Sequence, residues 1–213
     1  MKKACLLFWI LIQLCLDTFG QDKSDNIYLE TGFGTGSYSS FNIGIDMLVY
    51  ETHMFTISYS IQSRISSATP PGYQAGFSFS GGDQSPIDQL QLVYFIYGKV
   101  LYIPGFTPRF ALRGGIVVGN YFHPVNFVHV NPAAGSWFSI FPPYDTYTME
   151  KDFTTGLILN PTVELPFTSV LGILGGVFSI ISTQTNSYGV NINIMLGSLR
   201  DKTVQMKYRN SPY

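Results

Sequence analysis

Cysteine is almost absent from this sequence, because its two cysteines, Cys5 and Cys15, both lie within the first 20 residues. We expect those residues to be removed as a signal peptide, which would leave a mature chain without cysteine. This excludes a disulfide scaffold and a cysteine metal site. Charged residues are also scarce, at 12% of the chain, against about 25% in typical soluble domains.

The net charge offers no electrostatic case for binding nucleic acid. The formal charge of the whole chain is −1, and it becomes −2 when Lys2, Lys3 and Asp17 leave with the signal peptide. Nucleic-acid binding relies on a basic surface that neutralises phosphates, and this balance does not supply one. Aromatic residues, in contrast, reach 15%, with 14 Tyr and 17 Phe, and such residues suit a membrane interface.

The N-terminus has the layout of a secretion signal. Lys2 and Lys3 precede an apolar stretch over residues 4–16, and the small residue Gly20 follows. The stretch is shorter than the ~20 residues of a spanning helix, so an uncleaved anchor is the weaker alternative. A lipoprotein with Cys15 as its lipidated residue is a further alternative, which the bulky Leu14 disfavours. We expect three parts: a cleaved signal (1–20), one barrel domain (21–199) and a short periplasmic tail (200–213).

The mature chain alternates apolar and polar residues at period two, which predicts strands because a helix would need a period near 3.6. In 55–64, for example, Phe55, Ile57 and Tyr59 share one face and Thr56 and Ser58 the other. No window shows a convincing amphipathic helix. We therefore predict an all-β fold with eight strands, at Ile27–Gly34, Phe41–Val49, Phe55–Arg64, Gln89–Tyr102, Arg109–Phe122, Phe153–Leu165, Val170–Ser182 and Gly189–Leu196.

The connections between these strands alternate in length. Short ones lie near 50–53, 103–107 and 166–169, and the others lie near 35–39, 66–86, 123–151 and 184–188. Connections as long as 66–86 and 123–151 are unusual. With both termini in the periplasm, every long connection would face outside, as in outer membrane barrels. The pattern predicts an eight-stranded antiparallel up-and-down transmembrane β-barrel with short periplasmic turns and two long outer loops.

The few charged residues of the predicted strands lie on the polar faces, and this placement favours a barrel in a membrane. Pointed into a narrow lumen, they would neutralise one another, whereas an Arg or Lys facing lipid would cost about 2–4 kcal/mol at midplane. Eight strands enclose a space that side chains can fill, so we predict a plugged lumen. A soluble periplasmic ligand-binding barrel with its apolar face inward is an alternative, because the same alternation serves both. The predicted lumen ion-pair network comprises Glu30, Asp46, Arg64, Arg109, Arg113 and Glu164.

Several segments resemble a known group of proteins. They are Leu112-Arg113-Gly114-Gly115, the stretch from Asn160 to Phe167, and the closing strand from Gly189 to Gly197, after a Gln21 start. On these the chain resembles the small outer membrane β-barrel proteins of the OmpA/OmpX type, including the porin-like barrel domains common in Bacteroidetes. The resemblance implies membrane lipid, lipopolysaccharide and the barrel-assembly machinery as partners. The chain departs from the group's pattern in one respect, since residues 200–213 continue beyond the last strand.

Residues for catalysis or metal binding form no convincing pattern. His123 and His129, with Ser136, Ser139 or Asp145, could converge as in lipid A-modifying barrels, but no His-x-Ser spacing supports this alternative. The two histidines also lack a fixed-spacing carboxylate or thiolate for a metal. We therefore expect no enzymatic activity, no cofactor and no metal.

The connection 123–151 is the best candidate for recognition, because aromatic residues anchor protein contacts or settle at a lipid interface. A structural or recognition role toward an unknown extracellular partner is our main functional hypothesis. A small pore and a lipid-modifying enzyme are the alternatives. The candidate recognition residues are Phe127, Trp137, Phe138, Phe141, Tyr144 and Tyr147, with Phe122 at the start of the segment.

Overall fold

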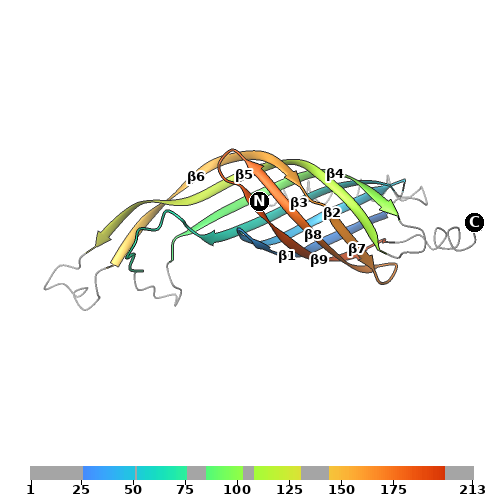
Figure 1. Cartoon of the computed structure of the whole chain (residues 1–213), viewed down its shortest axis with the longest axis horizontal. Helices are drawn as coiled ribbons and strands as arrows, with labels where there is room; N and C mark the ends of the chain where they lie inside the picture. The colour runs from blue at the N-terminus through green and yellow to red at the C-terminus, as the bar shows by residue number, and fades with distance from the viewer. Residues whose placement is uncertain (1–25, 51, 76–84, 103–107, 131–143, 200–213) are drawn as a thin grey trace, which may run out of the picture.

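The computed structural model describes residues 26–50, 52–75, 85–102, 108–130 and 144–199. The predicted signal peptide and periplasmic tail lie outside these residues. Within them no helix is long and apolar enough to cross a membrane. The strands are β1 (Asn26–Gly36), β2 (Ser39–Val49), β3 (His53–Ile65), β4 (Ile87–Tyr102), β5 (Arg109–Val130), β6 (Tyr144–Leu159), β7 (Thr162–Pro166), β8 (Leu171–Ser182) and β9 (Ser187–Gly197) (Figure 1).

The nine strands close into a ring with eight wall positions. Each strand pairs antiparallel with its neighbours, and β1 pairs with β9 to close the ring. Strands β6 and β7 share one position, because both pair with β5 on one side and β8 on the other. The break between them falls at Pro161, which has no N–H to donate to a ladder. The prediction of an eight-stranded antiparallel up-and-down barrel is confirmed, with one strand in two pieces.

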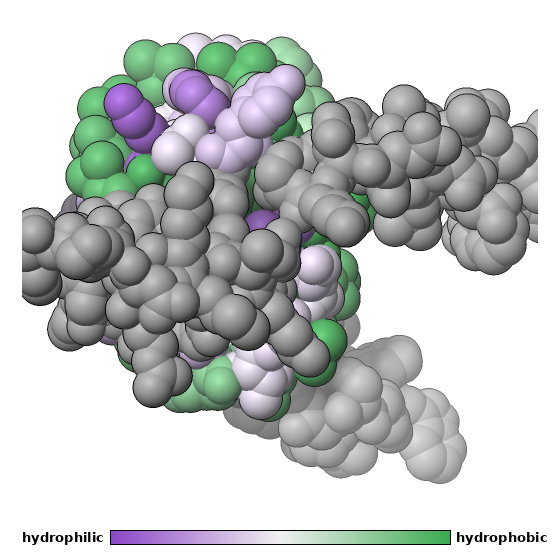
Figure 2. All heavy atoms as spheres, turned by 90° about the vertical axis from the view of Figure 1, so that its right-hand side faces the viewer, coloured by the Kyte–Doolittle hydropathy of each residue, from purple (hydrophilic) through white to green (hydrophobic). Residues whose placement is uncertain are grey.

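The wall has a polar inside and an apolar outside. In β2 the inward residues Asn42 and Asp46 are buried, whereas the outward residues Phe41, Ile43 and Ile45 are 38–42% exposed. A barrel that folds in water would bury the apolar set, so this wall has the opposite orientation. Figure 2, which looks along the barrel from one end, shows hydrophobic residues on the outside of the wall.

The two ends of the barrel differ, and we name them for what they carry. At the short-turn end, β1 begins, β9 ends, and β7 joins β8 through a turn in which Phe167 N–H and Thr168 N–H donate to the carbonyl of Leu171. Strand β4 ends and β5 begins at this end as well, and the predicted short connection at 103–107 lies outside the described residues. The opposite end carries the long strands β5 and β6, and we call it the hairpin end (Figure 1).

Strands β5 and β6 are much longer than predicted. Strand β5 continues from Phe122 to Val130, and β6 begins at Tyr144 rather than near 153. The prediction that all of 123–151 is a loop was therefore wrong at both ends of the segment, which belong to β5 and β6. Two local features hid the strands: a bulge between Val125 and Val128 interrupts the alternation, and Pro124 reads as a strand breaker. In the described residues β4 pairs with β5 only as far as Phe122. Pro124 therefore has no partner on the β4 side, and its missing N–H costs the sheet no hydrogen bond there.

Two glycines show how closely the wall strands approach one another. A Cβ at Gly115 would lie 2.1 Å from the carbonyl oxygen of Phe95, and a Cβ at Gly156 would lie 2.2 Å from that of Ile181. No side chain fits at either distance. Only glycine therefore lets the neighbouring strands approach this closely at these two positions.

Candidate functional site: the lumen and the outer hairpin

A buried triad of charges lies inside the barrel toward the short-turn end. Arg113 on β5 is 0% exposed. Its Nη1 atom lies 3.3 Å from Asp46 Oδ1 on β2 and 3.5 Å from Glu30 Oε2 on β1. The Thr56 hydroxyl also donates to Asp46. Strand alternation positions all of them, because each is an inward residue of its strand. One guanidinium therefore serves two carboxylates from the facing wall.

A second ion pair lies beside the triad. Arg109 and Glu164 are directly opposite on β5 and β7, and Arg109 Nη2 lies 2.7 Å from Glu164 Oε2. The Tyr28 hydroxyl donates to Glu164 Oε1 at 3.0 Å. Arg109 also donates to the carbonyl of Leu199 at 3.2 Å, and the Leu199 side chain is fully buried. Sequence reasoning missed Leu199, because it follows the last strand and belongs to no alternating pattern.

The sixth predicted network residue, Arg64, lies elsewhere. It is near the hairpin end of β3, where its Nη2 atom is 3.0 Å from Asp88 Oδ2 on β4. Its guanidinium also lies 4.5 Å from the centre of the Tyr38 ring. The structure therefore brings five of the six predicted network residues together and places Arg64 in a separate ion pair. Asp88 was missed because the strand was expected to begin at Gln89; the register pairs Arg64 with Asp88 directly.

An apolar cluster fills the half of the lumen toward the hairpin end. Strand β4 is apolar on both faces, because the residues of one face meet the exterior and those of the other face belong to this cluster. A polar link crosses it: Ser187 donates to Gln62 at 2.6 Å, and Gln62 donates to the Tyr94 hydroxyl at 2.9 Å. We call this cluster the lumen plug; its buried members are Tyr38, Leu90, Leu92, Tyr94, Ile96, Val117, Ile158, Phe178 and Ile180.

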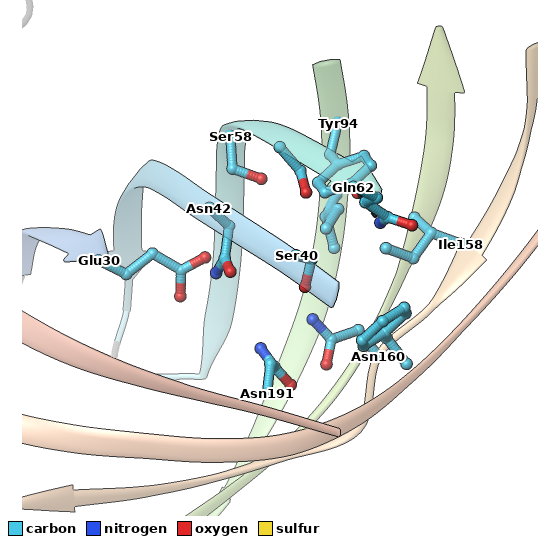
Figure 3. Close-up of a pocket in the computed structure, with 12 residues that line it drawn as sticks. Glu30, Ser40, Asn42, Ser58, Gln62, Tyr94, Ile158, Asn160 and Asn191 are labelled. Carbon is cyan, nitrogen blue, oxygen red and sulfur yellow. Dashed lines mark hydrogen bonds between the residues drawn. The ribbon is translucent and has the colours of Figure 1, made fainter. Parts of the chain in front are cut away.

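A small chamber separates the lumen plug from the buried charges. Its volume is about 30 Å³, which is room for about two water molecules. Figure 3 shows its residues, and Glu30 is the charged one among them. The chamber is lined by Glu30, Ser40, Asn42, Ser58, Ser60, Gln62, Tyr94, Ile96, Ile158, Asn160, Phe178 and Asn191.

Outside the barrel, a third segment packs against the parts of β5 and β6 that project beyond the wall. Residues 73–75 lie along β6, and Ala75 forms a parallel bridge with Asp145. Gln74 N–H donates to Asp145 Oδ2 at 2.7 Å, and Asp145 N–H donates to the carbonyl of Gln74 at 2.8 Å. The rings of Tyr73, Phe127 and Tyr147 pack together with centroids 5.9–6.5 Å apart. We call residues 73–75, 122–130 and 144–151 the outer hairpin.

The outer hairpin contains three of the six predicted recognition residues. Phe127 and Tyr147 are in contact, whereas Tyr144 pairs with Val130 at the start of β6. Trp137, Phe138 and Phe141 lie outside the described residues. Sequence reasoning missed Tyr73 and Gln74, because nothing in the pattern places the segment 66–75 against β6.

The histidines of the outer hairpin contact carboxylates. His129 Nδ1 lies 2.8 Å from Asp145 Oδ1. The Gln74 backbone N–H and then His129 hold the pKa of Asp145 below its usual value. His123 stacks on Tyr121 and lies 3.8 Å from Glu150 and 3.6 Å from Asp152.

These contacts give no catalytic triad among the described residues. Ser136 and Ser139, which the enzymatic alternative named beside the histidines, lie outside that part of the chain. Where the structure is described, no group of three or more His, Cys, Asp or Glu residues is placed to hold a metal ion.

Comparison with solved structures relates this fold to known barrels. The N-terminal β-barrel domain of Pseudomonas aeruginosa OprF superimposes with a TM-score of 0.50 at 9% sequence identity, over 81% of this chain and 96% of that one. The attachment invasion locus protein Ail of Yersinia pestis gives a TM-score of 0.47 at 10% identity, over 82% of this chain and 97% of that one. No family model and no curated protein matches the sequence.

The likeness to the OprF domain concerns the fold, which the architecture supports independently. The ring is closed, its exterior is apolar, and its interior holds buried ion pairs. The resemblance found in the sequence is therefore confirmed for the fold: the chain has the fold of the small outer membrane β-barrel proteins of the OmpA/OmpX type.

Proposed function

We propose that this chain is a non-enzymatic outer membrane protein whose barrel is a closed scaffold for recognition by the outer hairpin. In this proposal membrane lipid, including lipopolysaccharide, surrounds the wall. The barrel-assembly machinery inserts the barrel, and an extracellular partner contacts the hairpin. The observation that carries the proposal is the outer hairpin itself, three segments held together by backbone pairing on a closed wall.

The wall supports placement in a membrane. Its outward residues are large and apolar on every strand of the ring; Phe95, Ile116 and Ile192, for example, are 46–66% exposed. In water this surface would be an aggregation hazard, whereas lipid covers it at no such cost. Closure of the ring also leaves no unpaired edge within the lipid.

The filled lumen argues for a scaffold rather than a pore. Solute would have to pass the lumen plug, a chamber of about 30 Å³ and the buried charges in series. A chamber of this size holds about two waters. Arg113 and Glu164 are each fully buried, so neither lines an aqueous path.

The outer hairpin supports recognition because its shape is held by several independent contacts. The β5–β6 ladder fixes two segments, and Asp145 holds the third through Gln74 and His129. A platform ordered before binding loses less conformational entropy on contact than a mobile loop. Its surface offers aromatic rings beside the carboxylates of Asp145 and Glu150, which suits a partner with hydrogen-bond donors or positive charge.

The proposal is tested by displaying the protein on bacteria and measuring adhesion to arrays of glycans and extracellular matrix proteins. We expect adhesion to at least one surface, and its loss in the double variant Phe127→Ala and Tyr147→Ala. The matched control is Phe41→Ala with Phe55→Ala, which removes two rings from the lipid-facing wall. Adhesion to nothing, or equal adhesion by both double variants at equal surface level, would refute the recognition role.

A further inference from the structure

A positive charge lies on the lipid-facing surface of the barrel wall. Lys99 on β4 follows Phe95 and Tyr97 at the period of two, and all three side chains are exposed on the outside of the wall. In the part of the wall that the structure describes, the outer hairpin apart, Lys99 is the one Asp, Glu, Lys or Arg side chain that faces outward. A cation in the middle of the hydrocarbon is costly, so the depth of Lys99 matters.

The strand geometry places Lys99 at a boundary of the apolar band. Lys99 is opposite Leu112 on β5, and Lys151 of the outer hairpin is opposite Phe122, ten residues further along β5. At ~3.3 Å per residue and a tilt of about 40°, ten residues span roughly 25 Å of height, which is the height of the apolar band of an outer membrane barrel. Lys99 therefore lies at the short-turn boundary, where its ammonium group can reach the headgroups.

Two further polar side chains lie beside Lys99. His53, the first residue of β3, is directly opposite Lys99 in the register, so the two side chains start about 5 Å apart on the same face. The Tyr97 hydroxyl lies 2.7 Å from His53 Nδ1. Whichever of these two groups donates, one free donor remains: Nε2–H of His53 if the hydroxyl donates, or the hydroxyl hydrogen if Nδ1–H donates. The ion pairs of the described residues do not include Lys99.

We propose that His53, Tyr97 and Lys99 bind the phosphate of a phospholipid in the periplasmic leaflet, the leaflet at the short turns of such barrels. The phosphate accepts one charge-assisted hydrogen bond from the ammonium group and a second hydrogen bond from the His53–Tyr97 pair. The acyl chains lie along the exposed apolar wall, on which Phe55 and Phe95 continue toward the hairpin end.

The charge of Lys99 selects among phospholipids. One cation favours a lipid with one net negative charge, such as phosphatidylglycerol, over a zwitterionic lipid whose quaternary amine it repels. This site rests on the placement of the wall in the outer membrane, and it is independent of recognition by the outer hairpin.

The test measures lipid binding to the full mature protein in detergent by native mass spectrometry. Phosphatidylglycerol should bind about fivefold more tightly than phosphatidylcholine with the same chains, as expected for one cation at an anionic headgroup. Glycerophosphoglycerol, the same headgroup without chains, should not compete at equal concentration. Equal binding of the two lipids would overturn the proposal, and competition by the headgroup alone would replace it with a site for free phosphate.

Variants of the lysine locate the charge effect. Lys99→Met should remove the preference for phosphatidylglycerol, whereas Lys99→Arg should keep it. The matched control is Lys151→Met, at the opposite boundary, where the ammonium group lies over the Phe122 ring; this variant should keep the preference. A preference that survives in Lys99→Met, or that falls equally in Lys151→Met, would overturn the site.

Variants of the neighbouring pair test the second donor. The double variant His53→Phe with Tyr97→Phe removes this donor and should weaken the binding of both lipids, because both carry a phosphate. The control Tyr59→Phe removes a hydroxyl from the same face of β3, away from Lys99, and should change nothing. Unchanged binding in the double variant would overturn the role of the pair. Faster gel migration without boiling shows that each variant is folded, and none of these results bears on adhesion by the outer hairpin.

Discussion

Replacing Arg113 by Met should destabilise the barrel more than any surface substitution. The change removes the guanidinium that Asp46 and Glu30 share and leaves both carboxylates buried in the lumen. Met has a similar length and fills most of the space, so the loss of packing is small. The effect measured is therefore the loss of charge compensation.

The burial of the triad sets the magnitude. Arg113 and Asp46 are both 0% exposed in their side chains, so solvent screens their interaction little. Removing one partner of such a buried pair costs about 3–5 kcal/mol. The matched control is Arg64→Met, whose ion pair with Asp88 has one partner 32% exposed. Solvent reaches Arg64 and screens this pair, and its removal leaves one buried carboxylate rather than two, so it should cost less than the removal of Arg113.

The assay is urea unfolding in lipid vesicles, followed by circular dichroism and by gel mobility. With a slope of about 2 kcal/mol per M, the Arg113→Met midpoint should fall by roughly 2 M. Adding Glu30→Gln and Asp46→Asn to Arg113→Met should restore much of the loss, because a neutral network needs no guanidinium. Equal midpoints for Arg113→Met and Arg64→Met would show that the triad contributes nothing specific, and the account of the lumen would be wrong.

Three further outcomes are expected. Ile116→Arg places a charge on the lipid-facing wall and should cost about 2–4 kcal/mol in the same assay; an unchanged midpoint would mean that lipid does not cover this face. The lowered pKa of Asp145 stabilises the contact with Gln74 above its unfolded pKa of about 3.9, and this contribution is lost as pH falls through the lower folded value. Hydrogen-exchange protection of the Gln74 amide should therefore fall on acidification, and Asp145→Asn should abolish that step. In planar bilayers the protein should show no steady conductance, since the lumen plug closes the path; stable open channels would contradict this.

The strands of the wall could be predicted from the sequence, because the alternation of apolar and polar residues shows which side chains face outward and which face inward. Residues 41–49 show the period of two without interruption, and the structure places Phe41 outside and Asn42 inside. Asp46, Arg113, Arg109 and Glu164 were identified for the same reason, since each is an inward residue. Their contacts follow once the strand register is known.

The rest could not be predicted because it depends on register and on tertiary contact. The pairing of Arg64 with Asp88 requires the β3–β4 register, and the parallel bridge of Ala75 to Asp145 joins segments far apart in sequence. The chamber depends on the packing of residues from seven strands. The projecting strands were hidden by Pro124 and by the bulge after Val125.

Gel mobility with and without heating tests the central claim most directly. The full mature protein is taken from outer membranes in detergent and run on a denaturing gel, boiled and unboiled. A closed barrel with a packed lumen should stay folded without boiling and migrate faster, and the protein should fractionate with outer membranes. A soluble protein whose mobility does not change on boiling would contradict a closed barrel embedded in lipid.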